Sequence, residues 1–191
     1  MALWCLTKAN ELPLDIILAD IKRALEAGLF YLAINVSLSL PDICSALECD
    51  LIANPQCKFK ADRRYIPWCK KWLEPMFANF TAEDCWALRG SIIHQGQTFG
   101  HPKARYDRVL FTLPNGPWAG SHDNVADHIG GSTKAVLQLD AAHFCRSMAQ
   151  ATVNWYEASK HDPNVIANMP NLVQFRPYGY PPYFFGIPGI S

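Results

Sequence analysis

Residues 81–96 read TAEDCWALRGSIIHQG and carry the clearest structural signals in the chain. Thr81 is followed three residues later by Asp84, which is typical of a capping box, where a hydroxyl and a carboxylate satisfy the first free amides of a helix. Gly96 comes directly after the apolar periodicity, and glycine is the usual residue just past a helix end. We therefore predict a helix that begins after Thr81 and ends before Gly96.

This predicted helix carries two stripes. One is apolar and recurs at helical spacing: Cys85, Leu88 and Ile92. The other consists of small residues and ends in a histidine: Ala87, Gly90, Ser91 and His94. Because small side chains let a second backbone or a ligand come close, we expect the second stripe to be a contact surface.

More helices are predicted on the N-terminal side. Residues 15–40 carry apolar side chains at helical spacing, with Gly28 as an interruption or a point of close packing. A stop is predicted at Pro41, followed by a short helix over residues 43–48. Residues 63–77 again show a helical pattern with aromatic anchors.

The C-terminal half adds a β element and a long helix. Residues 108–113 alternate and are rich in β-formers, which predicts a short strand or a hairpin arm. Residues 118–131 are predicted to be a loop. A helix is then expected from Ser132 or Thr133 to about Lys160, roughly 40 Å long at 1.5 Å per residue. The chain is therefore predicted to be mostly α, with a short β element.

The last segment, residues 163–191, differs in composition from the rest. It holds six prolines, a single charged residue and a cluster of aromatic side chains. Disordered tails are usually charged and poor in aromatics, so we expect an extended tail docked on the body of the chain or across a dimer. The expected docking residues are Phe175, Tyr178 and Phe184. Residues 1–162 are predicted to form one helical domain.

The charge balance narrows the function classes. The 191 residues include 17 basic and 17 acidic ones, so the formal net charge is zero, and only 18% of the residues are charged. A neutral chain does not hold nucleic acid by overall charge, although a local basic site stays open. Because a surface poor in charge indicates apolar area that a partner buries, we expect a homodimer.

Cysteine and histidine spacing predicts no metal site and no cofactor. The seven cysteines contain no Cys-x-x-Cys pair. His122 and His128 are expected to be solvated loop residues. The sequence contains no run of about 18 uninterrupted apolar residues, so we predict no membrane span. The first residues lack the basic leader of a signal peptide. We therefore expect a cytoplasmic protein with reduced cysteines, of which Cys85 and Cys145 are core residues.

The residues best suited to chemistry are Arg89 and His94. Arginine offers a planar fork of donors that matches a phosphate, and histidine can move a proton near neutral pH. Their five-residue offset rotates the side chains by about 140° and separates them by about 7.5 Å along the axis, so one helix presents the pair poorly to one atom. Two antiparallel copies of the helix about a twofold axis would gather four such groups around one groove.

The Arg89-x4-His94 pattern near a helix end, inside a mostly α chain of this size, resembles the HEPN superfamily (higher eukaryotes and prokaryotes nucleotide-binding). Residues 40–44, LPDIC, and 84–96, DCWALRGSIIHQG, are similar to a group of bacterial proteins in that superfamily, and the resemblance spans about residues 15–160. Similar members are metal-independent endoribonucleases that act as dimers, as toxins, in phage defence or in RNA processing. The resemblance implies a HEPN-like helical bundle. It also implies that the RNA 2′-hydroxyl attacks the adjacent phosphorus, that His94 does acid–base work and that Arg89 holds the phosphate.

Gly90 departs from the family pattern, because active members usually carry a polar residue, often Asn, directly after the arginine. Ser91 would substitute for that residue in an active enzyme. Two alternatives stay open. One is a HEPN-fold protein that binds RNA or nucleotides, or acts as an adaptor, without cleavage. The other is a structural helical protein in which Arg89 pairs with a neighbouring acid and His94 interacts only with the last carbonyls of its helix.

A basic run offers a second nucleic-acid surface. Its cations are Lys58, Lys60, Arg63, Arg64, Lys70 and Lys71, and Phe59, Tyr65 and Trp68 lie among them. Such a run can grip an RNA backbone and stack bases; a solvated helix face is the alternative. RNA and an antitoxin protein are accordingly the expected partners besides a second copy of the chain.

Overall fold

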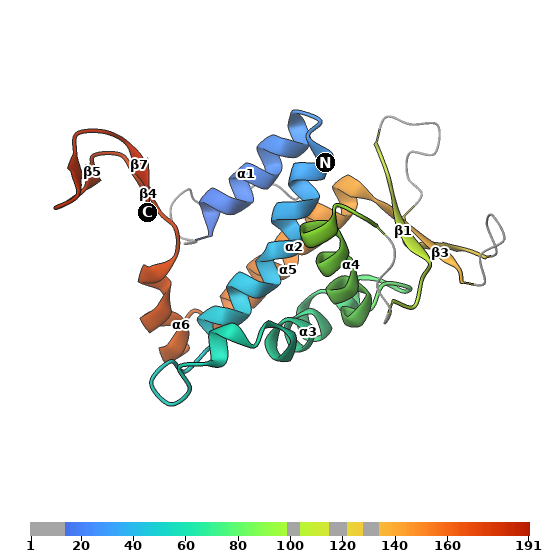
Figure 1. The fold of residues 1–191 in the computed structure, drawn as a ribbon, viewed down its shortest axis with the longest axis horizontal. Helices are drawn as coiled ribbons and strands as arrows, with labels where there is room; N and C mark the ends of the chain where they lie inside the picture. Colours follow the sequence, from blue (N-terminus) through green and yellow to red (C-terminus); the bar gives the residue numbers. More distant parts are fainter. Residues whose placement is uncertain (1–13, 99–103, 115–121, 128–133) are drawn as a thin grey trace.

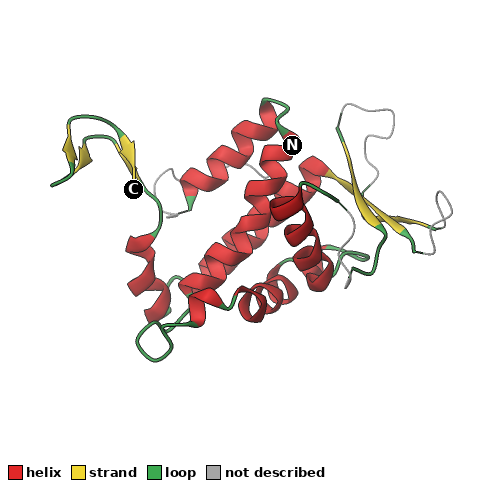
Figure 2. Cartoon of the chain, viewed as in Figure 1, coloured by secondary structure: helices red, strands yellow, loops and turns green. Residues whose placement is uncertain are grey.

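A computed structural model describes residues 14–98, 104–114, 122–127 and 134–191 of the chain. The chain is mostly α, as predicted, with a small sheet beside the helices and a projecting C-terminal segment (Figure 1; Figure 2). Helix α2, Phe30–Leu47, crosses the centre of the body and packs against α1, Asp15–Glu26, α3, Ala61–Trp72, and α5, Ala141–Ser159. By length and composition alone, α2 could also cross a membrane, but half of its residues are buried inside the fold.

The predicted break at Gly28 is confirmed, whereas the predicted stop at Pro41 is wrong. Gly28 has a φ of +73°, a left-handed conformation that glycine adopts without strain, and it turns the chain from α1 into α2. Helix α2 continues through Pro41 to Leu47. Proline inside a helix costs about 3 kcal/mol, but Leu40 and Cys44 around it are completely buried, so packing of the helix outweighs that cost.

Helix α4, Ala82–Gln95, has the predicted ends. Thr81 accepts a hydrogen bond from the Asp84 amide at 3.2 Å, and Asp84 accepts one from the Thr81 amide at 3.0 Å, which completes the capping box. Gly96 closes the helix with a φ of +65°. The helix predicted before it is shorter than expected: α3 ends at Trp72, and the short 3₁₀ helix η2, Glu74–Met76, replaces its last turn. A second 3₁₀ turn, η1, Cys57–Phe59, precedes α3.

The small sheet corrects two predictions. Strand β1, Arg108–Thr112, pairs in parallel with β3, Val136–Asp140, and β3 pairs antiparallel with β2, Asn124–Ala126. The predicted loop 118–131 therefore contains a strand. The predicted long helix also begins too early, since its described first residues form β3 and α5 starts only after Asp140. A short apolar run does not distinguish a buried strand from a helix; Asp140, which caps α5 by accepting a hydrogen bond from the His143 amide at 2.6 Å, marks the true start.

The end of the chain first packs on the body and then leaves it. Helix α6, Pro163–Asn168, buries Val165, and Asn168 donates to the carbonyls of Leu47 and Cys49 at 3.0 and 2.9 Å. After the 3₁₀ turn η4, Met169–Asn171, the chain forms two small antiparallel pairs of strands. These are β4, Phe175–Arg176, with β7, Gly189–Ile190, and β5, Gly179–Tyr180, with β6, Phe184–Phe185.

The segment expected to dock divides into two parts: α6 packs on the body, whereas Phe175 and Tyr178, two of the expected docking residues, do not. The tail projects beyond α6 (Figure 1), with Phe175 and Tyr178 56% and 84% exposed. Phe184 packs against Gly189 inside the tail instead. Docking across a dimer stays a prediction.

One cysteine prediction also fails. Cys49 and Cys57 form a disulfide, with Cα atoms 5.8 Å apart across a turn of the chain. The expectation that all cysteines are reduced is therefore wrong, and it no longer supports a cytoplasmic location, which stays a prediction from the other signals. Cys85 and Cys145 are buried core residues as predicted; burial raises the pKa of Cys145 to about 11.

Candidate functional site

Arg89 extends from α4 toward α2 and α3, where it meets a carboxylate. Its Nη2 atom lies 2.5 Å from Oδ2 of Asp42. The guanidinium also covers two aromatic rings, with its Cζ atom 5.1 Å from the ring centroid of Trp86 and 5.7 Å from that of Tyr65. Only 19% of the side chain is exposed. Arg89 is therefore held in one position by an acid 47 residues earlier in the chain.

A second arginine shares the same carboxylate. Arg64 of α3 donates through Nη1 to the Asp42 carbonyl at 2.6 Å and to Ser45 Oγ at 3.0 Å, and its Nη2 lies 3.7 Å from Asp42 Oδ1. Burial lowers the pKa of Arg64, and the charge of Arg89 lowers that pKa further, whereas Asp42 raises it. Two guanidinium groups against one carboxylate leave an excess of positive charge. We call Asp42, Arg64 and Arg89 the Arg–Asp–Arg cluster.

His94 lies elsewhere on the same helix. It is exposed in the last turn of α4. At about 100° per residue, its side chain leaves the axis about 140° away from that of Arg89. Within one chain, the two residues therefore do not meet at one atom, as the spacing predicts.

Between these two residues runs an open, uncharged strip of α4. We call Trp86, Gly90 and Ile93 the outer strip; they leave the axis within about 60° of one another, with Arg89 on one flank and His94 on the other. Trp86 and Gly90 are half-buried and Ile93 is exposed. A Cβ atom placed on Gly90 would meet nothing within 4 Å. The strip can therefore accept another surface without any change in the fold.

The predicted small-residue stripe is wrong for two of its four members. Ala87 and Ser91 are buried, and they line a narrow cavity together with Tyr106, which precedes β1, and Val109 of β1. Their small side chains let the chain's own β segment approach, and no second copy can reach them. Ser91 also points about 160° away from Arg89 around the helix, so it cannot replace the polar residue expected beside that arginine.

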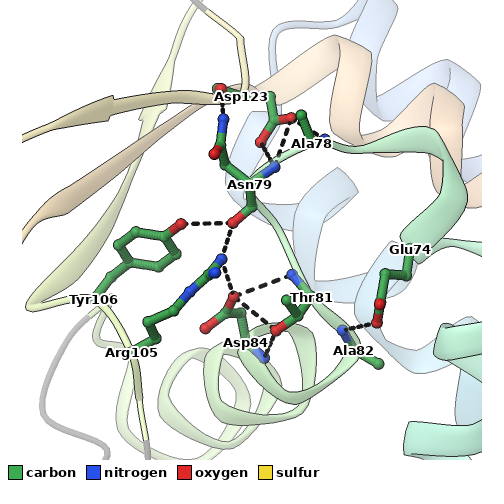
Figure 3. A network of polar contacts seen from close by, with 9 residues as sticks. All are labelled: Glu74, Ala78, Asn79, Thr81, Ala82, Asp84, Arg105, Tyr106 and Asp123. Atoms are coloured by element: carbon green, nitrogen blue, oxygen red, sulfur yellow. Dashed lines mark hydrogen bonds and ion pairs between the residues drawn. The ribbon is translucent and has the colours of Figure 1, made fainter.

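A polar network holds this β segment in place (Figure 3). Asp84, 5% exposed, accepts from Arg105 Nη2 at 2.9 Å in addition to its capping-box bonds. Arg105 also donates to the carbonyl of Asn79, and the Tyr106 hydroxyl donates to the same carbonyl at 2.6 Å. Asp84 is thus occupied by Arg105 and is not the partner of Arg89.

The same network reaches β2. Asp123 accepts from the amides of Ala78 and Asn79, and its carbonyl accepts from the Asn79 side chain at 2.8 Å. On the other side of the loop, Glu74 accepts from the Ala82 amide at 2.9 Å. The N-terminal end of α4 and the loop before it are therefore bonded to two segments distant in sequence, at Arg105 and Asp123, and to Glu74 of the nearby η2.

The prediction of a solvated His122 is wrong. Its Nδ1 atom accepts from the Asp140 amide at 3.2 Å, and its ring stacks on His143 with centroids 3.8 Å apart. Burial lowers the pKa of His122, and His143 lowers that pKa further. His128 lies outside the described residues. Within the part of the chain that the structure describes, no three His, Cys, Asp or Glu side chains gather as a metal site would require.

The basic run divides between core and surface. Arg64 belongs to the Arg–Asp–Arg cluster, and Tyr65 and Trp68 are buried in the core, so neither ring can stack on a base. The exposed cations are Lys60, Arg63, Lys70 and Lys71. Of these, Lys70 lies 3.7 Å from Glu83, and Phe59 is the exposed aromatic beside them. The side chain of Lys58 lies outside the described part.

Comparison with protein-family models, curated proteins and solved structures yields no match. The functional interpretation therefore depends on the geometry of α4. The sequence pointed to Arg89 and His94 but not to Asp42. The available signal was the carboxylate of Asp42 within residues 40–44, LPDIC, because a carboxylate can pair with an arginine.

Proposed function

We propose that the chain is a HEPN-like, metal-independent endoribonuclease whose site forms when two copies pair across the outer strip of α4. The observation that carries this proposal is the position of Arg89 and His94 on opposite flanks of an open, uncharged strip centred on Gly90. A twofold axis that is perpendicular to α4 and lies in the contact plane pairs antiparallel copies and leaves each flank on its own side. The two Arg89 side chains then lie along one edge of the contact and the two His94 side chains along the other, so that four groups surround one groove.

Each group has a separate task in this arrangement. The guanidinium of Arg89 neutralises the phosphate, and the excess positive charge of the Arg–Asp–Arg cluster strengthens that attraction. Asp42 fixes the direction of the guanidinium. His94, exposed at the end of α4, moves the proton as the 2′-hydroxyl attacks the adjacent phosphorus and the 5′-oxygen leaves. The exposed cations of α3 supply contacts to the RNA backbone.

Cleavage assays with matched variants test the proposal. His94→Ala should lower RNA cleavage by about 10²–10⁴-fold, and Arg89→Ala should lower both cleavage and RNA binding. Products should end in a 2′,3′-cyclic phosphate, DNA should stay intact, and EDTA should have no effect. Cleavage that survives His94→Ala contradicts the assignment.

The pairing across α4 is tested separately with Gly90→Leu, whose Cβ atom meets nothing within 4 Å and whose side chain projects into the strip. It should abolish cleavage and weaken dimer formation. Ala158→Leu, at an exposed position of α5, is the matched control and should change neither. A wild-type chain that sediments as a clean monomer at micromolar concentration removes the composite site.

A second candidate is RNA binding without cleavage. It is favoured by two observations: Arg89 already has a carboxylate partner, and Ser91 is buried on the far side of the helix. This candidate predicts that an intact dimer retains RNA on a filter but leaves every RNA pool uncut at high protein concentration. An antitoxin or adaptor partner belongs to either candidate.

A further inference from the structure

We propose that the tail of one copy, residues 173–191, docks into an apolar groove of a second copy. The groove lies between the first turn of α2, the end of α4 and strand β1. This contact is separate from the outer strip of α4 and does not depend on any RNA activity.

Exposed apolar side chains gather in two places on the described surface. Of the seventeen large apolar side chains that are exposed, eight lie in the tail: Val173, Phe175, Tyr178, Tyr180, Tyr183, Phe185, Ile187 and Ile190. Five line the groove: Leu29, Tyr31, Leu32, Leu110 and Leu113. Contiguous apolar surface of this kind marks a contact site, because leaving it in water costs about 25 cal/mol per Å².

The groove has the size and chemistry of a binding site. It encloses about 700 Å³, within the range of pockets that bury ligands much larger than one side chain. Among the residues that the structure describes, none of those lining the groove is charged. Strand β1 forms one wall of the groove; it pairs with β3, and its Val109 amide donates to the carbonyl of Thr98 at 2.9 Å. An incoming segment can therefore bury apolar side chains there.

The tail is an ordered segment rather than a loose end. Gln174 and Ser191 exchange two backbone hydrogen bonds of 2.7 and 3.1 Å, which close the tail at its base. The rings of Tyr180 and Tyr183 stack with centroids 5.7 Å apart. Its one charge, on Arg176, is covered by the Tyr180 ring. A preformed segment loses less entropy when it docks, and this one presents uncharged surface to an uncharged groove.

Within one chain, the groove and the base of the tail lie toward opposite ends of α2. The groove begins at the N-terminal end of α2, whereas the tail is attached through α6 to the C-terminal end of that helix, at Leu47. Eighteen residues of helix separate the two ends by about 27 Å. Figure 1 shows the tail turned away from the body on the far side of α1 from strand β1. A second copy is therefore the occupant that the geometry selects.

Self-association of the full chain, measured by sedimentation over a range of concentrations, tests the proposal. Tyr178→Glu in the tail and Leu32→Glu in the groove should each weaken association at least tenfold, because each places a charge in the apolar contact. Ile52→Glu, at a side chain 96% exposed and outside both surfaces, should have no effect. All three positions are exposed, and thermal melts confirm that each variant is folded.

Mixing identifies the occupant. Tyr178→Glu retains an intact groove and Leu32→Glu an intact tail, so the mixture should associate more tightly than either variant alone. The proposal is overturned if Tyr178→Glu associates like the wild type, if the mixture shows no recovery, or if the wild type is monomeric throughout. If Gly90→Leu loses association while Tyr178→Glu and Leu32→Glu retain it, the copies associate through α4 and the tail contact is overturned.

Discussion

The two sides of helix α4 use small residues for opposite purposes. On the inner side, Ala87 and Ser91 let the segment before β1 pack closely, and the network around Asp84 fastens that segment down. On the outer side, Gly90 faces open space. A small side chain in a helix therefore does not by itself identify the surface that meets a partner; the burial of its neighbours decides.

Arg89 lies at the border between these two sides. Its ion pair with Asp42 connects α4 to α2, which is a structural task, while its partly exposed edge flanks the outer strip. His94 has no such double task, since it lies in the exposed last turn. The inner side of α4 should therefore govern stability, and the outer side should govern association and chemistry.

The largest effect on stability is expected at Asp84. Asp84→Ala removes the capping box and leaves Arg105 and the Thr81 amide without their acceptor, so the free energy of unfolding should fall by about 3 kcal/mol. Glu83→Ala is the matched control, one residue away and exposed, and should change the stability by no more than about 0.5 kcal/mol. Urea denaturation measures both. Equal losses in the two variants would remove the distinction between inner and outer sides.

A smaller effect is expected at Arg89. Arg89→Met keeps the bulk of the side chain but removes the partner of Asp42, so the free energy of unfolding should fall by about 1–3 kcal/mol. The loss is limited because Arg64 still faces the carboxylate. His94→Ala should cost less than about 0.5 kcal/mol.

A double-mutant cycle with Asp42→Asn separates the pair from its surroundings. A coupling energy of at least 0.5 kcal/mol between positions 42 and 89 is expected, as for residues in one ion-pair network. If His94→Ala destabilised the fold as much as Arg89→Met, His94 would be a packing residue and its chemical role would be in doubt.

The ends of α4 and its core stripe could be predicted because their signals are local. A capping box lies within four residues, and Gly96 follows the helix directly. Cys85, Leu88 and Ile92 are all buried as their spacing predicts. The break at Gly28 belongs to the same class, since one residue determines the turn.

What could not be predicted depends on distant partners. The pairing of Arg89 with Asp42 joins residues far apart in sequence, and helical spacing does not show which stripe the β segment covers. Strand β3 was predicted to be helix because it is short and continues directly into the helical spacing of α5, although Leu137 and Leu139 alternate with Gln138 and Asp140. The Cys49–Cys57 disulfide follows from a turn of the chain that has no spacing motif.

Acid should destabilise the fold through His122, which bonds to the start of α5 and stacks on His143. Its pKa in the folded chain lies below the ordinary value of 6.5, because burial and the adjacent His143 disfavour the imidazolium. The unfolded chain therefore binds this proton first, and the free energy of unfolding should fall as the pH drops below about 6.5 and stay level above it.

Denaturation at several pH values, with His122→Asn beside the wild type, checks this sign. Asparagine retains an acceptor for the Asp140 amide but does not titrate, so the variant should lose less stability between pH 6.5 and 5. Identical pH profiles for the two proteins would show that His122 has the same pKa in both states.

A small effect on stability is expected at Gly90, and its sign is informative. Gly90→Ala adds one methyl group at a helix-interior position where a Cβ atom meets nothing within 4 Å. Glycine in a helix is less favourable than alanine by about 0.5–1 kcal/mol, so the isolated chain should become more stable by that amount. Thermal denaturation of dilute protein, where dimers dissociate, measures this gain. At concentrations that favour the dimer, the same methyl group should weaken association, because close approach of two α4 helices needs the glycine. A gain in stability at both concentrations would mean that the outer strip meets no partner. A loss in dilute protein would mean that Gly90 already packs within its own chain, and the comparison between the two sides of α4 would fail.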